Sequence, residues 1–319
     1  MELRLPLIFL TSLIITWLTI PWLIVFLKKL KYGQSISEYS LDEHKAKTGT
    51  PTMGGVAFVV IPVILFLIFF INDMDTNGWL LVFSYVGYAL IGFWDDVKII
   101  IEKKNDGLPA WFKFLLQGIL AFIFYFFYKD IASSSVVIPI VNWTLNLGWL
   151  YAVLVFFMLV GASNAVNLTD GMDGLAAGTS FLALIPFIYF AITQSSLSVA
   201  GFALAVLGSL VAYLRFNIYP AKIFMGDTGS LPLGALLATM AILLKQEVLL
   251  VLIGGVFVYE TLCVIIQIGS VKIRKKRVFK YTPIHYSYVL SGWKEVRVVH
   301  FFWLLGLIFA LLGVFLGSL

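Results

Sequence analysis

The residues best suited to chemistry in this sequence gather in the stretch Asn164 to Gly178, which reads NAVNLTDGMDGLAAG. It holds two carboxylates, Asp170 and Asp173, in a strongly apolar chain, where an ionised carboxylate is costly unless it is solvated, paired or bound to a metal. Carboxylates three residues apart lie on one face of a helix start or tight turn. Glycines between them let the backbone bend and let a ligand come close. The alternative interpretation is a polar turn between two membrane helices.

A second acidic pair lies in GFWDDVK, where Asp95 and Asp96 end an apolar run. Neighbouring carboxylates repel, which is costly unless a divalent cation or a nearby lysine offsets the repulsion. The pair therefore predicts a metal–phosphate site or a proton acceptor. The alternative is a charged span end next to Lys98.

A third motif, FMGDTGSLPLG, places Asp227 between glycines just before another apolar run. A few carboxylate oxygens suit Mg²⁺ when substrate phosphates supply the other ligands. The backbone N–H groups of residues 228–230, at a helix start, could bind an anion. The alternative is a helix N-cap with a loop in front.

Further polar groups lie in basic loops and in one span. Lys47, in DEHKAKTGTPTMGG, suggests a phosphate cradle, although a basic loop touching anionic lipid explains it nearly as well. His285 follows a basic cluster that suits either a lipid phosphate or membrane anchoring. Glu260, inside an apolar run, is either a proton-relay residue or the partner of a neighbouring donor.

The composition predicts the fold class. The chain has 319 residues, of which 61% are hydrophobic and 12% charged, and its mean hydropathy is +0.99. Soluble domains are nearer to about 25% charged. The apolar runs do not alternate as barrel strands do, so an all-α polytopic membrane protein is predicted, with one integral domain over residues 1–319. The single cysteine, Cys263, excludes a disulfide framework.

About ten transmembrane helices are expected, with the ninth bent or broken and a small hairpin within residues 129–146. The predicted spans are 5–27, 53–71, 79–94, 111–128, 147–162, 174–191, 198–214, 230–244, 247–269 and 297–317. Nineteen of the 22 basic residues fall in the loops after the first, third, seventh and ninth spans. The positive-inside rule then places these loops in the cytoplasm, both termini outside, and the acidic motifs on the cytoplasmic face. The net charge of +5 thus reflects orientation and does not indicate a nucleic-acid partner.

Taken together, TGTPTMGG, GFWDDVK, NAVNLTDGMDGLAAG, FNIYPAKIFMGDTGSLPLG and TPIH…GW resemble, in this order, the phospho-N-acetylmuramoyl-pentapeptide transferases. These enzymes belong to the polyprenyl-phosphate N-acetylhexosamine-1-phosphate transferase superfamily, and the resemblance covers essentially the whole chain. It implies Mg²⁺-dependent transfer of phospho-MurNAc-pentapeptide from UDP-MurNAc-pentapeptide to undecaprenyl phosphate, giving lipid I and UMP. It also implies a multi-pass protein of the bacterial plasma membrane that forms a homodimer.

The resemblance also implies roles for particular residues. By motif position, Asp95 and Asp96 are the paired aspartates, one of them the base, His285 is catalytic, and Asp227 is the Mg²⁺ ligand. Substrate contacts are implied for Lys47, Thr52, Asn167, Asp170, Gly171, Met172, Asp173, Asn217 and Phe224.

The chain departs from the family pattern at two places. Where the family usually reads PxHHHF, this chain has PIHYSY, so that Tyr286 and Ser287 replace the second and third histidines. We therefore expect either that His285 alone matters or that the triplet is largely structural. The lysine usual beyond the aspartate pair is shifted, which leaves Lys98 a weak match.

Two other functions remain open at this stage. A sister transferase that moves GlcNAc-1-phosphate would share the aspartates but normally carries a different histidine-rich loop. A cation-coupled transporter would use Glu260 and the aspartates, although nearly all carboxylates fall on one predicted face instead of along a path through the membrane.

Overall fold

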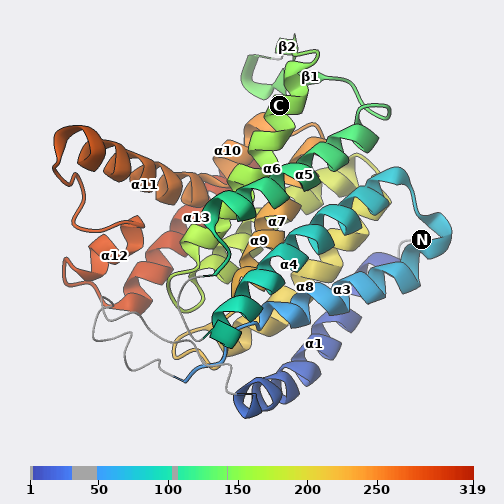
Figure 1. Cartoon of the computed structure of the whole chain (residues 1–319). Coiled ribbons are helices and arrows are strands. Elements are labelled where there is room, and N and C mark those ends of the chain that lie inside the picture. The colour runs from blue at the N-terminus through green and yellow to red at the C-terminus, as the bar shows by residue number, and fades with distance from the viewer. Residues whose placement is uncertain (1–2, 31–48, 103–106, 142) are drawn as a thin grey trace.

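The computed structural model describes residues 3–30, 49–102, 107–141 and 143–319 as a bundle of helices with one small sheet at its end (Figure 1). The elements in chain order are α1 (Arg4–Lys29), α3 (Gly55–Phe70), η1 (Ile71–Asp73), α4 (Thr76–Glu102), α5 (Ala110–Tyr128), β1 (Ser135–Ile138), η2 (Pro139–Val141), β2 (Trp143–Asn146), α6 (Leu150–Thr169), α7 (Leu175–Thr193), α8 (Leu197–Asn217), α9 (Asp227–Leu243), α10 (Glu247–Ile253), α11 (Gly255–Arg274), α12 (Ile284–Val289) and α13 (Glu295–Gly317).

The all-α polytopic prediction is confirmed. Nine helices in the described ranges are long and apolar enough to cross a membrane, and α9 is a shorter apolar helix. Large apolar side chains such as Trp22 on α1, Ile268 on α11 and Leu311 on α13 stay exposed, as expected of surfaces that face lipid. The predicted count of about ten therefore becomes nine full-length spans and one short helix.

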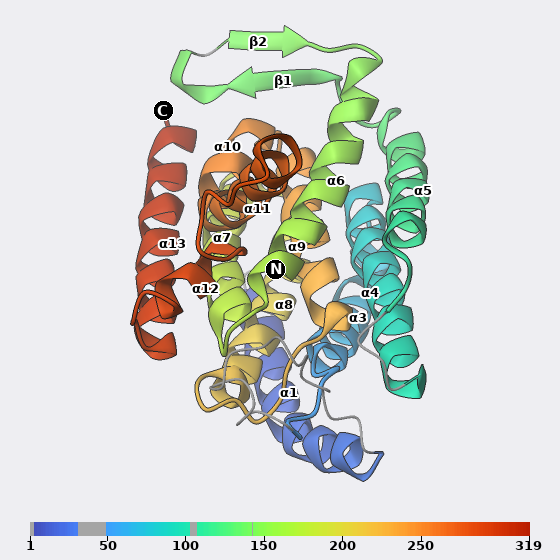
Figure 2. The same cartoon turned by 60° about the vertical axis from the view of Figure 1, so that its left-hand side comes forward.

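The short helix α9 lies at the centre of the bundle (Figure 2). Every residue from Thr228 to Ile242 is buried, as expected for a helix that is apolar on all sides. Helices α4 and α6 pack against it most extensively, and α3, α7 and α10 also contact it. A Cβ at Gly92 of α4 would overlap the backbone of Asp227, and one at Gly234 would overlap the backbone of α6. Small residues thus allow the close helix contacts that bring the acidic motifs together.

Two predicted spans, 79–94 and 147–162, end too early. Helix α4 continues to Glu102 and α6 continues to Thr169. Polar residues normally weaken the prediction that a helix continues through an apolar run. Here their side chains form hydrogen bonds with other helices, so the helices continue. Asn167, for example, donates a hydrogen bond to the carboxylate at the start of α9. Asp95 and Asp96 on α4, and the amides Asn164 and Asn167 on α6, therefore lie on helical turns and not on loops.

Two finer predictions are confirmed. The ninth span is broken at Gly254, which separates α10 from α11, and α11 projects away from the bundle (Figure 1). The segment 129–146 contains an antiparallel hairpin in which Val136 pairs with Leu145.

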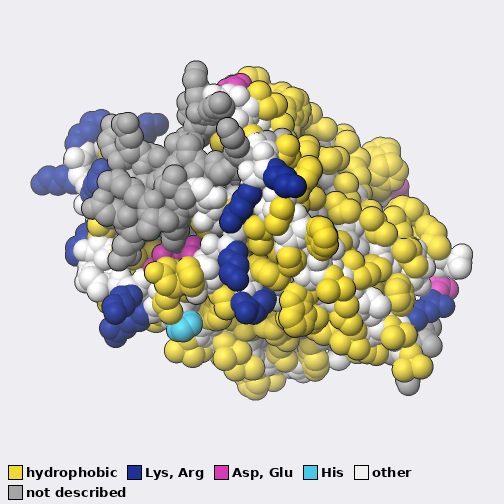
Figure 3. Space-filling view, turned by 90° about the horizontal axis from the view of Figure 1, so that it is seen from below, with side chains coloured by type: hydrophobic (Ala, Val, Ile, Leu, Met, Phe, Trp, Pro, Cys, Tyr) yellow, Lys and Arg dark blue, Asp and Glu magenta, His cyan; other side chains and the backbone are white. Residues whose placement is uncertain are grey.

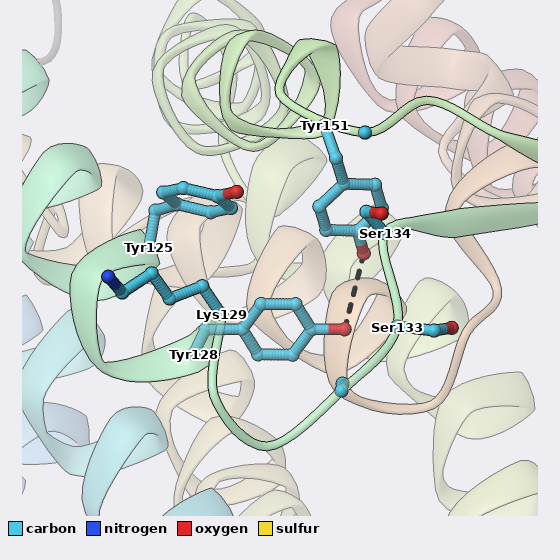
Figure 4. A pocket seen from close by; sticks show the side chains of 8 residues that line it. Tyr125, Tyr128, Lys129, Ser133, Ser134 and Tyr151 are labelled. Atoms are coloured by element: carbon cyan, nitrogen blue, oxygen red, sulfur yellow. Dashed lines mark hydrogen bonds between the residues drawn. The ribbon is translucent and has the colours of Figure 1, made fainter.

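Beside this hairpin, a buried polar cluster joins α5, α6 and the start of α10. The Tyr151 hydroxyl donates to Glu247 Oε1 at 2.5 Å, and Lys245 Nζ lies 2.9 Å from the same oxygen. The Tyr128 and Tyr151 hydroxyls are 3.2 Å apart (Figure 4). A cavity of about 350 Å³ adjoins the cluster and is lined by Tyr125, Tyr128, Lys129, Ala132, Ser133, Ser134, Gly148 and Tyr151.

We expect Tyr151→Phe to lower the midpoint of thermal unfolding in detergent. The substitution leaves the buried Glu247 carboxylate without one of its donors, which costs about 1–3 kcal/mol. Tyr125→Phe, on the same cavity wall, is the matched control and should leave the midpoint near that of the unsubstituted protein. Equal effects of the two substitutions would show that the cluster does not stabilise this end of the fold.

Candidate active site

Three carboxylates meet where α4 passes the start of α9. Asp95 and Asp96 are buried on α4, Asp227 is half-buried as the first residue of α9, and oxygens of all three lie within 4.8 Å of one another. Such a cluster could hold a divalent cation. The sequence motifs containing these residues are far apart in the chain, and the structure brings them together. Figure 3 shows several basic side chains and a small acidic patch on one face of the molecule.

Asp96 binds the first turn of α9. Its carboxylate accepts hydrogen bonds from the backbone N–H groups of Asp227 (3.1 Å) and Thr228 (2.9 Å) and from the Thr228 hydroxyl (2.6 Å). These N–H groups have no partner within the helix, and the positive end of the helix dipole favours an anion there. Gly226 precedes the helix with a φ of +69°, and a Cβ there would overlap Asp96.

The predicted anion site at residues 228–230 is therefore wrong in its detail. The Thr228 N–H is already bound to Asp96, and the N–H groups of Gly229 and Ser230 bond to the Gly226 carbonyl. The helix start does bind an anion, but that anion is a side chain of α4.

Lys113 supplies the positive charge of the cluster. From the first turn of α5, its Nζ lies 2.9 Å from Asp95 Oδ1 and 2.6 Å from Asp227 Oδ2. Sequence reasoning missed this residue. Lys98, the weak sequence match, instead donates to the Gly107 carbonyl at 3.0 Å. The sequence did contain a signal for it. Lys113 is a lone cation one turn into an apolar run, and such a cation is costly in a membrane unless it is paired.

One amide of α6, Asn167, completes the surroundings of Asp227, and a second, Asn164, bonds to α5. Asn167 Nδ2 donates to Asp227 Oδ1 at 2.6 Å and to the Ser230 hydroxyl at 2.9 Å. Asn164, one turn earlier, donates to Gln117 of α5 at 2.8 Å. The predicted residue Asn167 thus orients Asp227 from one side while Lys113 holds it from the other.

The turn between α6 and α7 carries the remaining acidic pair. Burial, followed by the charges of Asp227, Asp96 and Asp173, raises the pKa of Asp170 to about 8. Asp173 is buried, and its Oδ2 accepts the N–H of Ala221 at 2.9 Å. Asp170 is thus coupled electrostatically to the carboxylate cluster, whereas Asp173 ties the turn to the loop before α9.

Several other predicted substrate residues hold the loops around the site. Asn217 is buried, accepts the Gly174 N–H at 3.1 Å and donates to the Ile223 carbonyl at 2.9 Å. Phe224 is half-buried, and its N–H donates to the Pro51 carbonyl at 2.8 Å.

Of the other predicted substrate residues, Thr52 and Met172 are buried. Lys47 lies outside the residues that the structure describes.

His285 reaches the same turn from the short helix α12. It is fully buried, its Nδ1 lies 3.0 Å from Glu260 Oε1, and a Cβ at Gly171 would overlap its Nε2. Of the two interpretations of Glu260, the structure supports a residue paired with neighbouring donors. Tyr286, which stands in place of a histidine, donates to the Gly171 carbonyl at 3.1 Å, and Ser287 donates to the Tyr281 carbonyl at 2.6 Å.

Comparison with known proteins adds to this geometry. The family "Glycosyl transferase family 4" matches residues 78–245, and "Phospho-N-acetylmuramoyl-pentapeptide-transferase signature 1" matches residues 47–59. A phospho-N-acetylmuramoyl-pentapeptide-transferase of Geobacillus thermodenitrificans is 47% identical over 308 residues, 96% of this chain and 95% of its own. Proteins of the same name from Oceanobacillus iheyensis and Bacillus anthracis are both 49% identical, over 312 and 300 residues. The alignment with the Oceanobacillus iheyensis protein covers 96% of this chain and 95% of that protein. The alignment with the Bacillus anthracis protein covers 93% of each.

If the three carboxylates bind a cation, it competes with the Lys113 ammonium for Asp95 and Asp227. We therefore expect Lys113→Gln to strengthen Mn²⁺ binding, observed by electron paramagnetic resonance, by about tenfold or more, because one opposing charge is removed at short range. Asp227→Asn should weaken binding by a similar factor. Lys98→Gln, on the same face of the site but bonded to Gly107, is the control. Unchanged affinity in both Lys113→Gln and Asp227→Asn would place the cation elsewhere.

The raised pKa of Asp170 predicts a pH-dependent stability. Between its ordinary value of 3.8 and its folded value of about 8, the folded protein holds a proton that the unfolded chain has lost. The contribution of Asp170 to stability therefore falls as the pH rises through this window and is constant above it. In chelator-treated protein, Asp170→Asn should raise the thermal midpoint over the unsubstituted protein more at pH 9 than at pH 5. The exposed Asp130→Asn should show no such trend, and a pH-independent difference for Asp170→Asn would contradict the assignment.

Proposed function

This chain belongs to the phospho-N-acetylmuramoyl-pentapeptide-transferase family, and we propose that it transfers phospho-MurNAc-pentapeptide from UDP-MurNAc-pentapeptide to undecaprenyl phosphate. The products are lipid I and UMP, and the reaction is the first membrane step of peptidoglycan synthesis. In the net reaction, an oxygen of the lipid phosphate bonds to the sugar-linked phosphorus, and the bond from that phosphorus to UMP breaks. The cluster of Asp95, Asp96, Asp227 and Lys113 carries this proposal, because both substrates bring phosphate groups to it.

The carboxylate cluster fits the divalent cation that the family implies. Its oxygens lie within 4.8 Å of one another and are the hard ligands that Mg²⁺ prefers. Asp227, held by Asn167, is the proposed ligand. Bound there, Mg²⁺ would neutralise phosphate charge and stabilise the leaving UMP. Lys113, which holds the same carboxylate in the described structure, would remain beside the phosphates as a positive charge.

The two aspartates of α4 have different surroundings. Asp96 accepts three hydrogen bonds from the start of α9, whereas Asp95 accepts the Leu108 N–H at 2.8 Å and pairs with Lys113. A carboxylate has about four lone-pair sites, so Asp95 retains more capacity to take up a proton. We assign to Asp95 the role of base toward the lipid phosphate and to Asp96 the role of holding α9 in place.

The nucleotide is proposed to bind along the turn between α6 and α7. Asp170, Gly171 and Met172 form this turn, and the buried Asn217 fixes its end through the Gly174 N–H. Substrate contacts are also proposed for Lys47, Thr52, Asn167, Asp173 and Phe224. The contacts of Asp173 and Asn217 with backbone favour an indirect role, in which they shape the pocket.

The proposed location of the site in the cell rests on the distribution of charge in the sequence. We propose that the chain forms one integral-membrane domain of the bacterial plasma membrane, with both termini outside and the carboxylate cluster facing the cytoplasm. The distribution of basic residues in the loops supports this orientation. UDP-linked precursors would then approach from the cytoplasm while the lipid tail stays in the bilayer.

The test is release of UMP by detergent-purified protein given undecaprenyl phosphate, Mg²⁺ and either UDP-MurNAc-pentapeptide or UDP-GlcNAc. We expect turnover with the muramoyl nucleotide only. Asp227→Ala should lower kcat by about 100-fold or more, because the cation that would stabilise transition-state charge loses its proposed ligand. Asp130→Asn, beyond the far end of α5, is the matched carboxylate control. Turnover with UDP-GlcNAc would assign the chain to the sister reaction, and no turnover by folded protein would overturn the proposal.

A further inference from the structure

Two fully buried side chains face each other between α11 and α12. Glu260 Oε1 lies 3.0 Å from His285 Nδ1, and Glu260 Oε2 accepts the Ile284 N–H at 2.7 Å. One carboxylate therefore holds both the first residue of α12 and the ring of its neighbour. The two residues are 25 positions apart and belong to different helices, so this contact fixes the position of α12 against the broken ninth span.

The geometry distinguishes the two ring nitrogens. An ionised carboxylate only accepts hydrogen bonds, so the short contact with Oε1 requires a proton on Nδ1. The Ile284 N–H donates to the other oxygen, Oε2, so both oxygens of the Glu260 carboxylate act as acceptors. Glu260 thus fixes Nδ1 as the donor. The other nitrogen, Nε2, can then bind a different group.

Nε2 is in an unusual position. It is buried and has no hydrogen-bond partner within the described ranges. It packs directly on Gly171, the residue that follows Asp170, and a side chain at Gly171 would occupy its place. A buried nitrogen without a partner is costly, so a substrate group or a water that binds it would remove this cost. Nε2 therefore lies against the turn beside the carboxylate cluster.

We propose that Glu260 is a positioning residue for the transfer reaction, which acts through His285. Glu260 keeps a proton on Nδ1 and orients the ring so that Nε2 meets a phosphate oxygen of the substrate bound at the turn. For this contact the ring takes up one proton from the solvent at Nε2. The Nε2–H of the resulting imidazolium then donates a hydrogen bond to the phosphate oxygen, and the Glu260 carboxylate balances the charge of the ring. The inference rests on the proposed function for the identity of the substrate, but the pairing itself is independent of it.

The first test observes the ring directly. The chain has three histidines, so His44→Gln with His300→Gln leaves His285 as the single histidine. Long-range ¹H–¹⁵N correlation spectra of ¹⁵N-histidine-labelled protein in detergent then report which nitrogen carries a proton. We expect a proton on Nδ1, with or without one on Nε2, and a changed proton distribution in Glu260→Gln. An Nδ1 without a proton in the presence of Glu260 would overturn the proposal.

Tyr286→Phe is the matched control for this spectrum. It removes the hydroxyl that bonds to the Gly171 carbonyl, next to the same ring, without touching Glu260. We expect the ¹⁵N pattern of His285 to stay as it is. A change as large as that in Glu260→Gln would show that any disturbance of the turn moves the proton, and would count against a specific role of Glu260.

The second test is a double-mutant cycle with Glu260→Gln and His285→Asn. Asparagine retains an N–H donor near the position of Nδ1 but has nothing in place of Nε2. Glu260→Gln should lower kcat by about 10- to 100-fold, the usual effect of removing the partner that orients a functional histidine, with a smaller change in KM. His285→Asn, which removes the histidine itself, should lower kcat at least as much. If Glu260 acts through His285, the double variant should lose little more than His285→Asn alone. Independent, multiplying losses would overturn the positioning role.

These tests separate the inference from the proposed function. If the unsubstituted protein turns over the muramoyl nucleotide but the losses multiply, the positioning role fails and the function stands. If no nucleotide is turned over but the spectra show an Nδ1 proton that depends on Glu260, the proposed function fails and the pairing stands.

Discussion

The structure depends on one buried interaction, the three hydrogen bonds that Asp96 accepts from the first two residues of α9. A hydrogen bond to a charged group contributes about 1.5–3 kcal/mol, and a buried charge that loses its partner costs about 3–5 kcal/mol. Because α9 is buried on all sides, the position of its start determines how α4 and α6 pack. The same contact sets where Asp227 lies, since Asp227 is the first residue of the helix. The stability of the core and the geometry of the site are therefore not separable here.

Charge balance is the second constraint. Asp95, Asp96 and Asp227 lie together, and Lys113 forms the ion pairs described for this cluster. Burial, followed by the charges of Asp227 and Asp96, raises the pKa of the nearby Asp170. The helix dipole offsets part of the charge at Asp96. The remaining negative charge favours a cation, and a cation in turn favours phosphate. A metal ion bound by these carboxylates would thus allow the proposed site to receive two phosphate-bearing substrates.

Much of this could be predicted from the sequence, because composition and hydropathy determine a bundle of membrane helices, and carboxylates beside glycines stand out in an apolar chain. The broken ninth span and the hairpin were also predicted. Contacts across helices were not. Lys113 carries no spacing signal relative to Asp227, which is 114 positions away. The extension of α6 through Asn167 depends on an acceptor that only the folded α9 provides. Such pairs are properties of packing and cannot be read from local patterns.

The two replaced histidines clarify what the first histidine of the motif, His285, must do. Burial, with smaller effects of neighbouring groups such as Tyr281 and Asp170, raises the pKa of Tyr286, so its hydroxyl remains a donor to the Gly171 carbonyl. Ser287 closes the loop onto Tyr281. Both positions need only a hydroxyl, which donates at Tyr286 and both donates and accepts at Ser287. His285 instead needs one nitrogen that donates to a buried carboxylate and a second that faces the turn at Gly171. Only an imidazole offers two such nitrogens at opposite edges of one rigid ring, and this accounts for a chain that retains one histidine of the three.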